Sequence, residues 1–293
     1  MSKAKIGVIS MMLNKKIAEI GIYETLRQYA DIGFRCLEVS QLEMNSDNIA
    51  ELKKACKDFG IKIPVISAAL EPMFPNNPNM PARPSYSLET DFEKIVSDCK
   101  ELGSTVVRIG SLPLTYSVCG EKYIEFAQKC ERAAEKLAQH GIRLYYHNHN
   151  WEFAKFNGKH GLDLIRENTS KLGFELDVHW AWRGGVDPAK LIKEYAGRVD
   201  LIHLKDYRIG APDPEILKES DIRKIFGALM DSVQFAEIGE GTLDFAAIIE
   251  AGLESGAEYF FIEQDDTYGR DVMESLKISA QNIRALGYGE LIK

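Results

Sequence analysis

Eight short apolar runs, separated by longer amphipathic segments, constrain the fold of this 293-residue chain more than any other feature of its sequence. Each run is rich in β-branched or aromatic residues and is bounded by turn residues, which predicts a β-strand. The amphipathic segments carry capping residues typical of helices, such as Ser46 or Asp47 at the start of residues 46–60. The eight predicted strands are residues 5–10, 35–40, 62–70, 105–111, 142–149, 173–179, 199–206 and 258–264.

Strand–helix alternation repeated eight times predicts a parallel sheet with helices packed against it. Eight such units fit into residues 1–293 as a single (β/α)8 TIM-barrel domain. A doubly wound open sheet is the competing α/β fold, but it would normally carry a glycine-rich phosphate loop after an early strand. The first loop here, SMMLNKK, has no glycine. We also predict a proline-rich loop at 72–85, over the barrel mouth, and a long insertion at 207–233.

Charge and cysteine content narrow the range of functions. The chain has 36 Lys and Arg against 44 Asp and Glu, a net charge of −8. This balance argues against broad binding to nucleic acids or anionic membranes, and no apolar stretch is long enough to span a membrane. The five cysteines form no CxxC pair, so neither a disulfide framework nor a thiolate zinc site is expected. With no recognisable signal peptide, we predict a cytoplasmic protein.

Metal-competent side chains fall at the C-terminal ends of the last four predicted strands. Alternate residues of a strand share a face, and in a TIM barrel the C-terminal strand ends carry the active site. The residues that face the barrel axis by this parity are His147, Asp177, His203 and Glu263. Chance could supply one or two such residues, but four on successive strands are hard to explain as packing. Their mixed nitrogen and oxygen donors suit one catalytic divalent ion such as Mn²⁺, Co²⁺, Zn²⁺, Fe²⁺ or Mg²⁺.

Further candidate residues lie close to these four. Lys205 shares a face with His203, and a lysine at a barrel mouth must pair with a carboxylate such as Glu263 or bind a substrate oxygen. Glu152 follows the fifth strand and is either a general acid or base, a metal ligand or a surface carboxylate. The candidates for substrate contact are His149, His179, Trp180 and Arg108. Ordinary packing is the alternative for the first three, and a salt bridge across the barrel is the alternative for Arg108 and for Glu38.

Five segments carry a resemblance to a known family. They are HNHNWEF (147–153), ELDVHWAWRGGVDP (175–188), GRVDLIHLKD (197–206), EIGEGTLDF (237–245) and FIEQDD (261–266). With them the chain resembles the sugar phosphate isomerase/epimerase superfamily, whose barrels look like xylose isomerase and endonuclease IV. The resemblance extends over nearly the whole chain. It does not specify a substrate, because the superfamily includes isomerases, epimerases, dehydratases and lyases.

The resemblance also implies a ligand set. Such enzymes typically hold one divalent metal by Glu, Asp, His and Glu from the fifth to eighth strands, which implies Asp177, His203 and Glu263 as the last three ligands. The first position falls on His147, where many relatives have glutamate, so either His147 or Glu152 would be the first ligand. In relatives with glutamate there, the first and last ligands also shuttle the proton. A histidine at this position could therefore change the base and the reaction.

These observations imply a divalent-metal-dependent isomerase or epimerase of a sugar or cyclitol. A base would remove a proton next to a carbonyl, and the metal would stabilise the enediolate. A dehydratase or β-eliminating lyase of a keto sugar or inosose is the close alternative, because it needs the same enediolate. The predicted catalytic residues are Glu152, Glu263, His147 and Lys205.

Two other function classes are less favoured. A non-catalytic sugar-binding subunit would not need the acid and base groups that the chain retains. An endonuclease IV-like repair enzyme would need three zinc ions and many more histidines than the six here. A small-molecule carbohydrate is therefore the expected partner, with no nucleic acid and no membrane. The oligomeric state stays open, and a homo-oligomer is compatible with the sequence.

Overall fold

The computed structural model describes residues 4–71, 86–230 and 232–293. Eight parallel strands close into a barrel in the order β1-β12-β9-β8-β5-β4-β3-β2. The strands are β1 (Lys5–Ile9), β2 (Cys36–Val39), β3 (Lys62–Ala68), β4 (Val106–Ile109), β5 (Arg143–His147), β8 (Gly173–Asp177), β9 (Val199–Leu204) and β12 (Tyr259–Ile262). Each lies within one of the eight predicted runs, so the predicted (β/α)8 barrel is confirmed. The proline-rich segment 72–85 falls outside the described residues.

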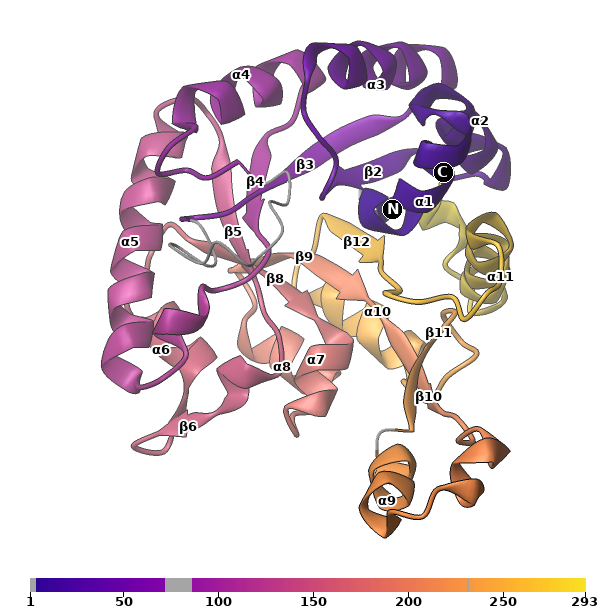
Figure 1. The fold of residues 1–293 in the computed structure, drawn as a ribbon. Helices are drawn as coiled ribbons and strands as arrows, with labels where there is room; N and C mark the ends of the chain where they lie inside the picture. The colour runs from indigo at the N-terminus through magenta and orange to yellow at the C-terminus, as the bar shows by residue number, and fades with distance from the viewer. Residues whose placement is uncertain (1–3, 72–85, 231) are drawn as a thin grey trace.

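Helices surround the barrel, as Figure 1 shows. They are α1 (Asn14–Ile20), α2 (Ile22–Ile32), α3 (Ser46–Phe59), α4 (Phe92–Leu102), α5 (Gly120–Ala138), α6 (Gly161–Glu167), α7 (Val178–Arg183), α8 (Pro188–Glu194), α10 (Phe245–Glu254) and α11 (Val272–Ala285). The N-cap of α3 is Asn45, whose side chain accepts the N–H of Asn48, and not Ser46 or Asp47 as the sequence suggested. Short 3-10 turns lie at η1 (Ser10–Leu13), η2 (Leu114–Tyr116), η3 (Trp151–Phe153) and η5 (Gly289–Leu291).

The barrel interior changes from apolar to polar along its axis. The apolar layer inside the barrel comprises Cys36, Val65, Val106, Tyr145, Leu201 and Phe261. The alternate residues of the same strands, such as Tyr146 and Ile202, pack outward in the core under the helices. Gly173 makes room for this inner layer, because a Cβ there would lie 2.2 Å from the ring of Tyr145. The parity assumed from the sequence is therefore correct, and it directs the next inward residues toward the C-terminal strand ends.

The predicted insertion forms an arm that extends away from the barrel (Figure 1). Two antiparallel strands, β10 (Asp206–Ile209) and β11 (Val233–Ala236), carry η4 (Pro214–Lys218) and α9 (Ile222–Met230). The buried carboxylate of Asp206 accepts backbone N–H groups of Gly239 and Thr242 and so joins the base of the arm to the turn after β11. Among the described residues, no helix is both long enough and apolar enough to cross a membrane.

Candidate active site

The four predicted metal ligands converge at the C-terminal end of the barrel. Each offers one nitrogen or oxygen donor, and these donor atoms all lie within 4.8 Å of one another. The four side chains are buried. The barrel register explains the convergence, because Asp177 at the end of β8 lies beside His203 on β9. Glu263 follows directly after β12, which pairs with β9 on its other side.

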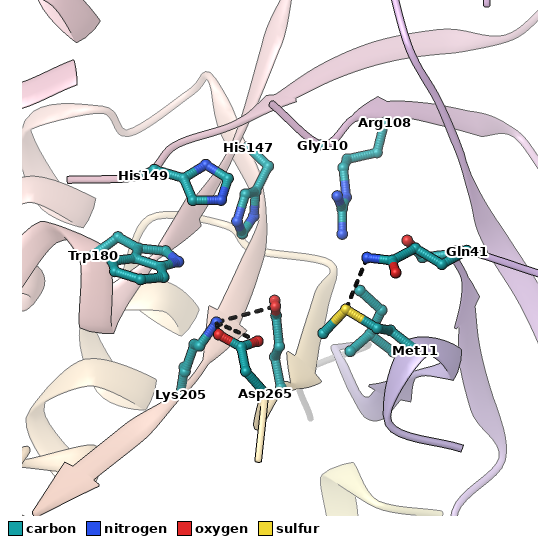
Figure 2. A pocket seen from close by; sticks show the side chains of 12 residues that line it. Met11, Gln41, Arg108, Gly110, His147, His149, Trp180, Lys205 and Asp265 are labelled. Atoms are coloured by element: carbon teal, nitrogen blue, oxygen red, sulfur yellow. Dashed lines mark hydrogen bonds and ion pairs between the residues drawn. The ribbon is translucent and has the colours of Figure 1, made fainter. Parts of the chain in front are cut away.

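The cluster opens into a cavity of about 180 Å³. Figure 2 shows His147, His149 and Trp180 along one side of this cavity, and Arg108 and Gln41 along the opposite side. Lys205 and Asp265 face each other below them. The lining residues are Ile9, Met11, Ser40, Gln41, Arg108, Gly110, His147, His149, Trp180, Lys205, Glu263 and Asp265.

The unpaired atoms of the cluster fit a divalent cation. One carboxylate oxygen of Asp177 accepts the N–H of Trp180 at 2.8 Å, whereas its buried Oδ2 has no hydrogen-bond partner in the described structure. Burial raises the pKa of Asp177, because a charged carboxylate is costly away from water. A bound cation would remove both penalties. Two imidazoles and two carboxylates are a donor set that suits Mn²⁺, Co²⁺ or Zn²⁺, and Mg²⁺ less well.

Glu263 lies between two cationic partners. Its Oε2 contacts Nδ1 of His203, and its Oε1 accepts from Nζ of Lys205 at 3.1 Å. Burial by itself would raise the pKa of Glu263, but Lys205 and His203 hold it well below the usual value. Burial would likewise lower the pKa of Lys205, but Glu263, Asp177 and Asp265 raise it. Glu263 is therefore an ionised carboxylate and Lys205 an ammonium at neutral pH.

The two histidines of β5 and its following loop are neutral. Burial lowers the pKa of His147 well below 6.5 and the pKa of His149 to about 3. His149 stacks on Trp151, with ring centroids 4.3 Å apart and planes 5° from parallel. A neutral imidazole keeps one lone pair, so each of these side chains can bind a metal or accept a hydrogen bond.

Arg108 occupies the barrel interior beneath the cluster. Its Nη2 lies 2.6 Å from Oε1 of Glu38, and its Nε lies 2.8 Å from Oε2 of Glu175. The salt bridge across the barrel, the alternative suggested for Arg108 and Glu38, is therefore present. The guanidinium also lines the cavity, so substrate contact by Arg108 stays a prediction.

Two predicted site residues lie apart from the cavity. Glu152 is fully buried with its carboxylate bonded to the hydroxyl of Tyr146 and, at 2.9 Å, to the backbone N–H of His149. Tyr146 faces outward from β5 toward α5, and this contact turns Glu152 away from the barrel axis. The structure thus brings His147, and not Glu152, into the donor cluster. His179 likewise does not line the cavity: it packs against the rings of Trp180, Tyr207 and Phe235, and its contact with substrate stays a prediction.

Several residues that line the cavity were given no role from the sequence. Asp265 accepts from Nζ of Lys205 at 2.8 Å, and its strand parity with Glu263 could have indicated it. Gln41 has a φ of 54°, which is unusual for a residue with a side chain. Its amide donates to the sulfur of Met11 at 2.9 Å. No local sequence signal reports this conformation.

Replacing Glu152 with glutamine is expected to remove a pH-dependent loss of stability. Burial raises the pKa of Glu152 from 4.5 to about 7, so its contribution to stability is complete below pH 4.5 and is lost as the pH rises to about 7. A glutamine at this position cannot ionise. Between pH 4.5 and 7.5 the wild type should therefore lose about 3 kcal/mol of unfolding free energy that the variant Glu152→Gln keeps.

Urea unfolding at several pH values measures this difference. Glu290→Gln, at an exposed carboxylate, is the control and should follow the wild type throughout. Parallel pH profiles for Glu152→Gln and the wild type would contradict the buried ionisable position of Glu152.

Two curated proteins are similar to part of this chain. The rhizopine catabolism protein MocC of Rhizobium meliloti is 27% identical over 151 residues, which are 50% of this chain and 44% of that protein. An inosose dehydratase of Geobacillus kaustophilus (strain HTA426) is 30% identical over 119 residues, 40% of this chain and 37% of that enzyme. The matched parts thus span less than half of these curated relatives.

A solved structure and a family model cover far more of the chain. A sugar phosphate isomerase/epimerase from Parabacteroides distasonis ATCC 8503 superposes with a TM-score of 0.74 at 19% identity, over 99% of this chain and 100% of that one. At this identity the likeness supports the fold alone. The model of the xylose isomerase-like TIM barrel family matches residues 26–286. This chain therefore belongs to the xylose isomerase-like TIM barrel family.

Proposed function

We propose that this protein is a divalent-metal-dependent enzyme that removes a proton next to a carbonyl of a sugar or cyclitol, as an isomerase or epimerase does. The observation that carries the proposal is the buried donor cluster at the C-terminal strand ends, open to the cavity. The residues that would hold the metal are His147, Asp177, His203 and Glu263. When bound, the metal would polarise the carbonyl and offset the negative charge that develops next to it.

The charged groups of the cavity suit acid–base chemistry. Glu263 is ionised and lines the cavity, so it is the candidate base toward a substrate carbon. Lys205 lies against it as an ammonium and can donate a hydrogen bond to a substrate oxygen. Asp265 also accepts a hydrogen bond from Nζ of Lys205, at 2.8 Å, so two carboxylates hold the ammonium at the cavity wall.

The aromatic side of the cavity suits a ring-shaped substrate. Trp180 lines the cavity, and Nζ of Lys205 lies 4.9 Å from the centre of its ring. His149 lies beside it, with ring centroids 5.4 Å apart. An indole face can cover the C–H face of a sugar or cyclitol, while the neutral imidazole exchanges hydrogen bonds with hydroxyl groups.

Dehydration is the second candidate, and a specific observation favours it. The inosose dehydratase of Geobacillus kaustophilus is 30% identical over the matched 119 residues. Elimination of water needs one base and one acid, and Glu263 with its neighbour Lys205 is such a pair. Proton removal next to the carbonyl is common to both candidates, so the same site serves either reaction.

Substrate turnover in D2O distinguishes the two candidates. The protein, reconstituted in turn with Mn²⁺, Co²⁺, Zn²⁺ and Mg²⁺, is mixed with keto sugars and inososes and the products are analysed by mass spectrometry and NMR. A rearranged product that carries solvent deuterium indicates isomerisation or epimerisation, and a product lacking one water indicates dehydration. If the protein binds metal and sugar but shows neither turnover nor deuterium exchange, it is a sugar-binding protein and not an enzyme. If it binds none of these metal ions, the proposal is refuted.

A further inference from the structure

Gln41, in the loop after β2, has a backbone conformation that glycine adopts more easily. Its φ of 54° lies in the left-handed region, where a side chain is crowded by its own backbone. The loop is anchored on both sides of this residue. The carbonyl oxygen of Ser40 accepts from the hydroxyl of Ser10 at 2.9 Å, and the carbonyl oxygen of Gln41 accepts from the side-chain amide of Asn14 at 3.1 Å. The segment after β1 thus holds both peptide groups that flank Gln41.

This strained residue places its side chain at the cavity, where it is only weakly bonded. Gln41 lines the cavity, and Figure 2 shows its side-chain amide on the side opposite Trp180 and His149. Among the described residues, this amide bonds only to the sulfur of Met11, at 2.9 Å. A thioether is a weak acceptor, so the amide loses little when it exchanges the sulfur for a stronger partner.

The chemistry of the side chain indicates which substrate group it would meet. A carboxamide carries two donor hydrogens and one acceptor oxygen without a charge, so it matches a hydroxyl group, which also donates and accepts. Glycine would fit the backbone of this position with less strain. Backbone strain of this kind occurs where a side chain is used in binding or catalysis.

We propose that Gln41 is a specificity-determining residue, which binds a hydroxyl group of the substrate on the cavity side opposite Trp180. The substrate would then lie between the indole of Trp180 and the carboxamide of Gln41, with Glu263 and Lys205 also at the cavity wall. The inference rests on the proposed function, whose acid–base and metal-binding groups do not include Gln41.

Two substitutions separate the contribution of the amide from that of the backbone. Gln41→Met keeps a side chain of similar length without the amide, and Gln41→Gly also removes the crowding at positive φ. Loss of one hydrogen bond should raise KM by about 2- to 12-fold in both variants. The value of kcat should change little, because a contact made equally in the bound substrate and the transition state affects KM alone.

Steady-state kinetics of the metal-loaded protein test this expectation. The substrates are the keto sugar or inosose that is turned over fastest and its single-deoxy analogues. In the wild type, the analogue that lacks the hydroxyl bound by Gln41 should have a raised KM, and neither substitution should raise that KM further.

Asn157→Gly is the matched control for the backbone change. Asn157 also has a positive φ, of 50°, but lies in the turn between β6 (Lys155–Phe156) and β7 (Lys159–His160) and does not line the cavity. This variant should keep the wild-type KM with every analogue. Thermal unfolding of all variants should show an intact fold, since glycine suits both positions.

The outcomes separate this inference from the proposed function. Wild-type KM in both Gln41 variants, or a KM increase that persists with every deoxy analogue, would overturn the role of Gln41 while the enzyme remains active. A wild type that neither binds nor turns over any of these sugars would refute the proposed function, and this inference with it.

Discussion

Replacing Glu263 with glutamine is expected to lower kcat/KM by about 10²- to 10⁴-fold through the loss of proton transfer alone. The carboxylate is the ionised candidate base, and Glu263 belongs to the donor cluster, where its Oε2 contacts His203. Because glutamine is a poor base and a weak ligand, metal content should fall together with turnover. Elemental analysis and steady-state kinetics on the same preparation measure both quantities.

The companion variant His203→Ala should lose metal in the same way. Thermal unfolding must accompany both variants, because removal of Glu263 leaves the buried Lys205 without one of its acceptors. Glu237→Gln serves as the control, because Glu237 is a buried carboxylate that pairs with Arg270 and lies outside the donor cluster. Full activity and one metal ion per chain in Glu263→Gln would refute the assigned role of Glu263.

Replacing Arg108 with methionine is expected to give the largest loss of stability. The guanidinium is buried between Glu38 and Glu175, and its removal leaves two carboxylates in the barrel interior without their cation. Breaking a buried pair in this way typically costs about 3–5 kcal/mol. Urea unfolding at neutral pH measures the difference.

The loss of stability in Arg108→Met should also increase as the pH rises. Burial raises the pKa of Glu175. Burial would also raise the pKa of Glu38, but Arg108 and His203 hold it below its usual value. Loss of Arg108 would therefore raise the pKa of both carboxyl groups. A carboxyl whose folded-state pKa is raised adds stability below its unfolded pKa and loses it as the pH rises. The difference in unfolding free energy between the wild type and Arg108→Met should therefore be smaller at pH 5 than at pH 8.

Arg27 provides a matched surface control for this experiment. It also pairs with two carboxylates, Glu24 and Asp31, but on the exposed face of α2. Solvent screens such pairs, so Arg27→Met should leave the stability nearly unchanged. A similar small effect at Arg108 would show that the buried carboxylates do not depend on its charge.

The barrel and the donor cluster could be predicted from the sequence because both follow from local periodicity. The period of two along a strand places His147 and Tyr145 on one face, and the structure has Tyr145 inside the barrel. A parallel barrel aligns the C-terminal ends of its strands, so inward residues at those ends must meet. That reasoning brought together four residues from β5, β8, β9 and the end of β12.

The position of Glu152 and the partner of Asp265 could not be inferred in the same way. Glu152 lies on η3, where no strand parity applies, and its direction depends on the hydroxyl of Tyr146 on the outer face of β5. Asp265 lies beyond the end of β12, and its contact with Lys205 requires the side-by-side arrangement of β9 and β12.

The strands, their inward faces and the residue types at the strand ends follow from the amino-acid sequence alone, because each is a property of neighbouring residues. The partner of each buried charge follows from how the strands pack in the barrel. The ion pairs of Arg108 join β4 to β2 and β8, and the hydrogen bond from Lys205 to Asp265 joins the end of β9 to the segment after β12. Such contacts depend on distances of about 3 Å between side chains far apart in the chain, and hydrogen-bond geometry at that scale is set by packing.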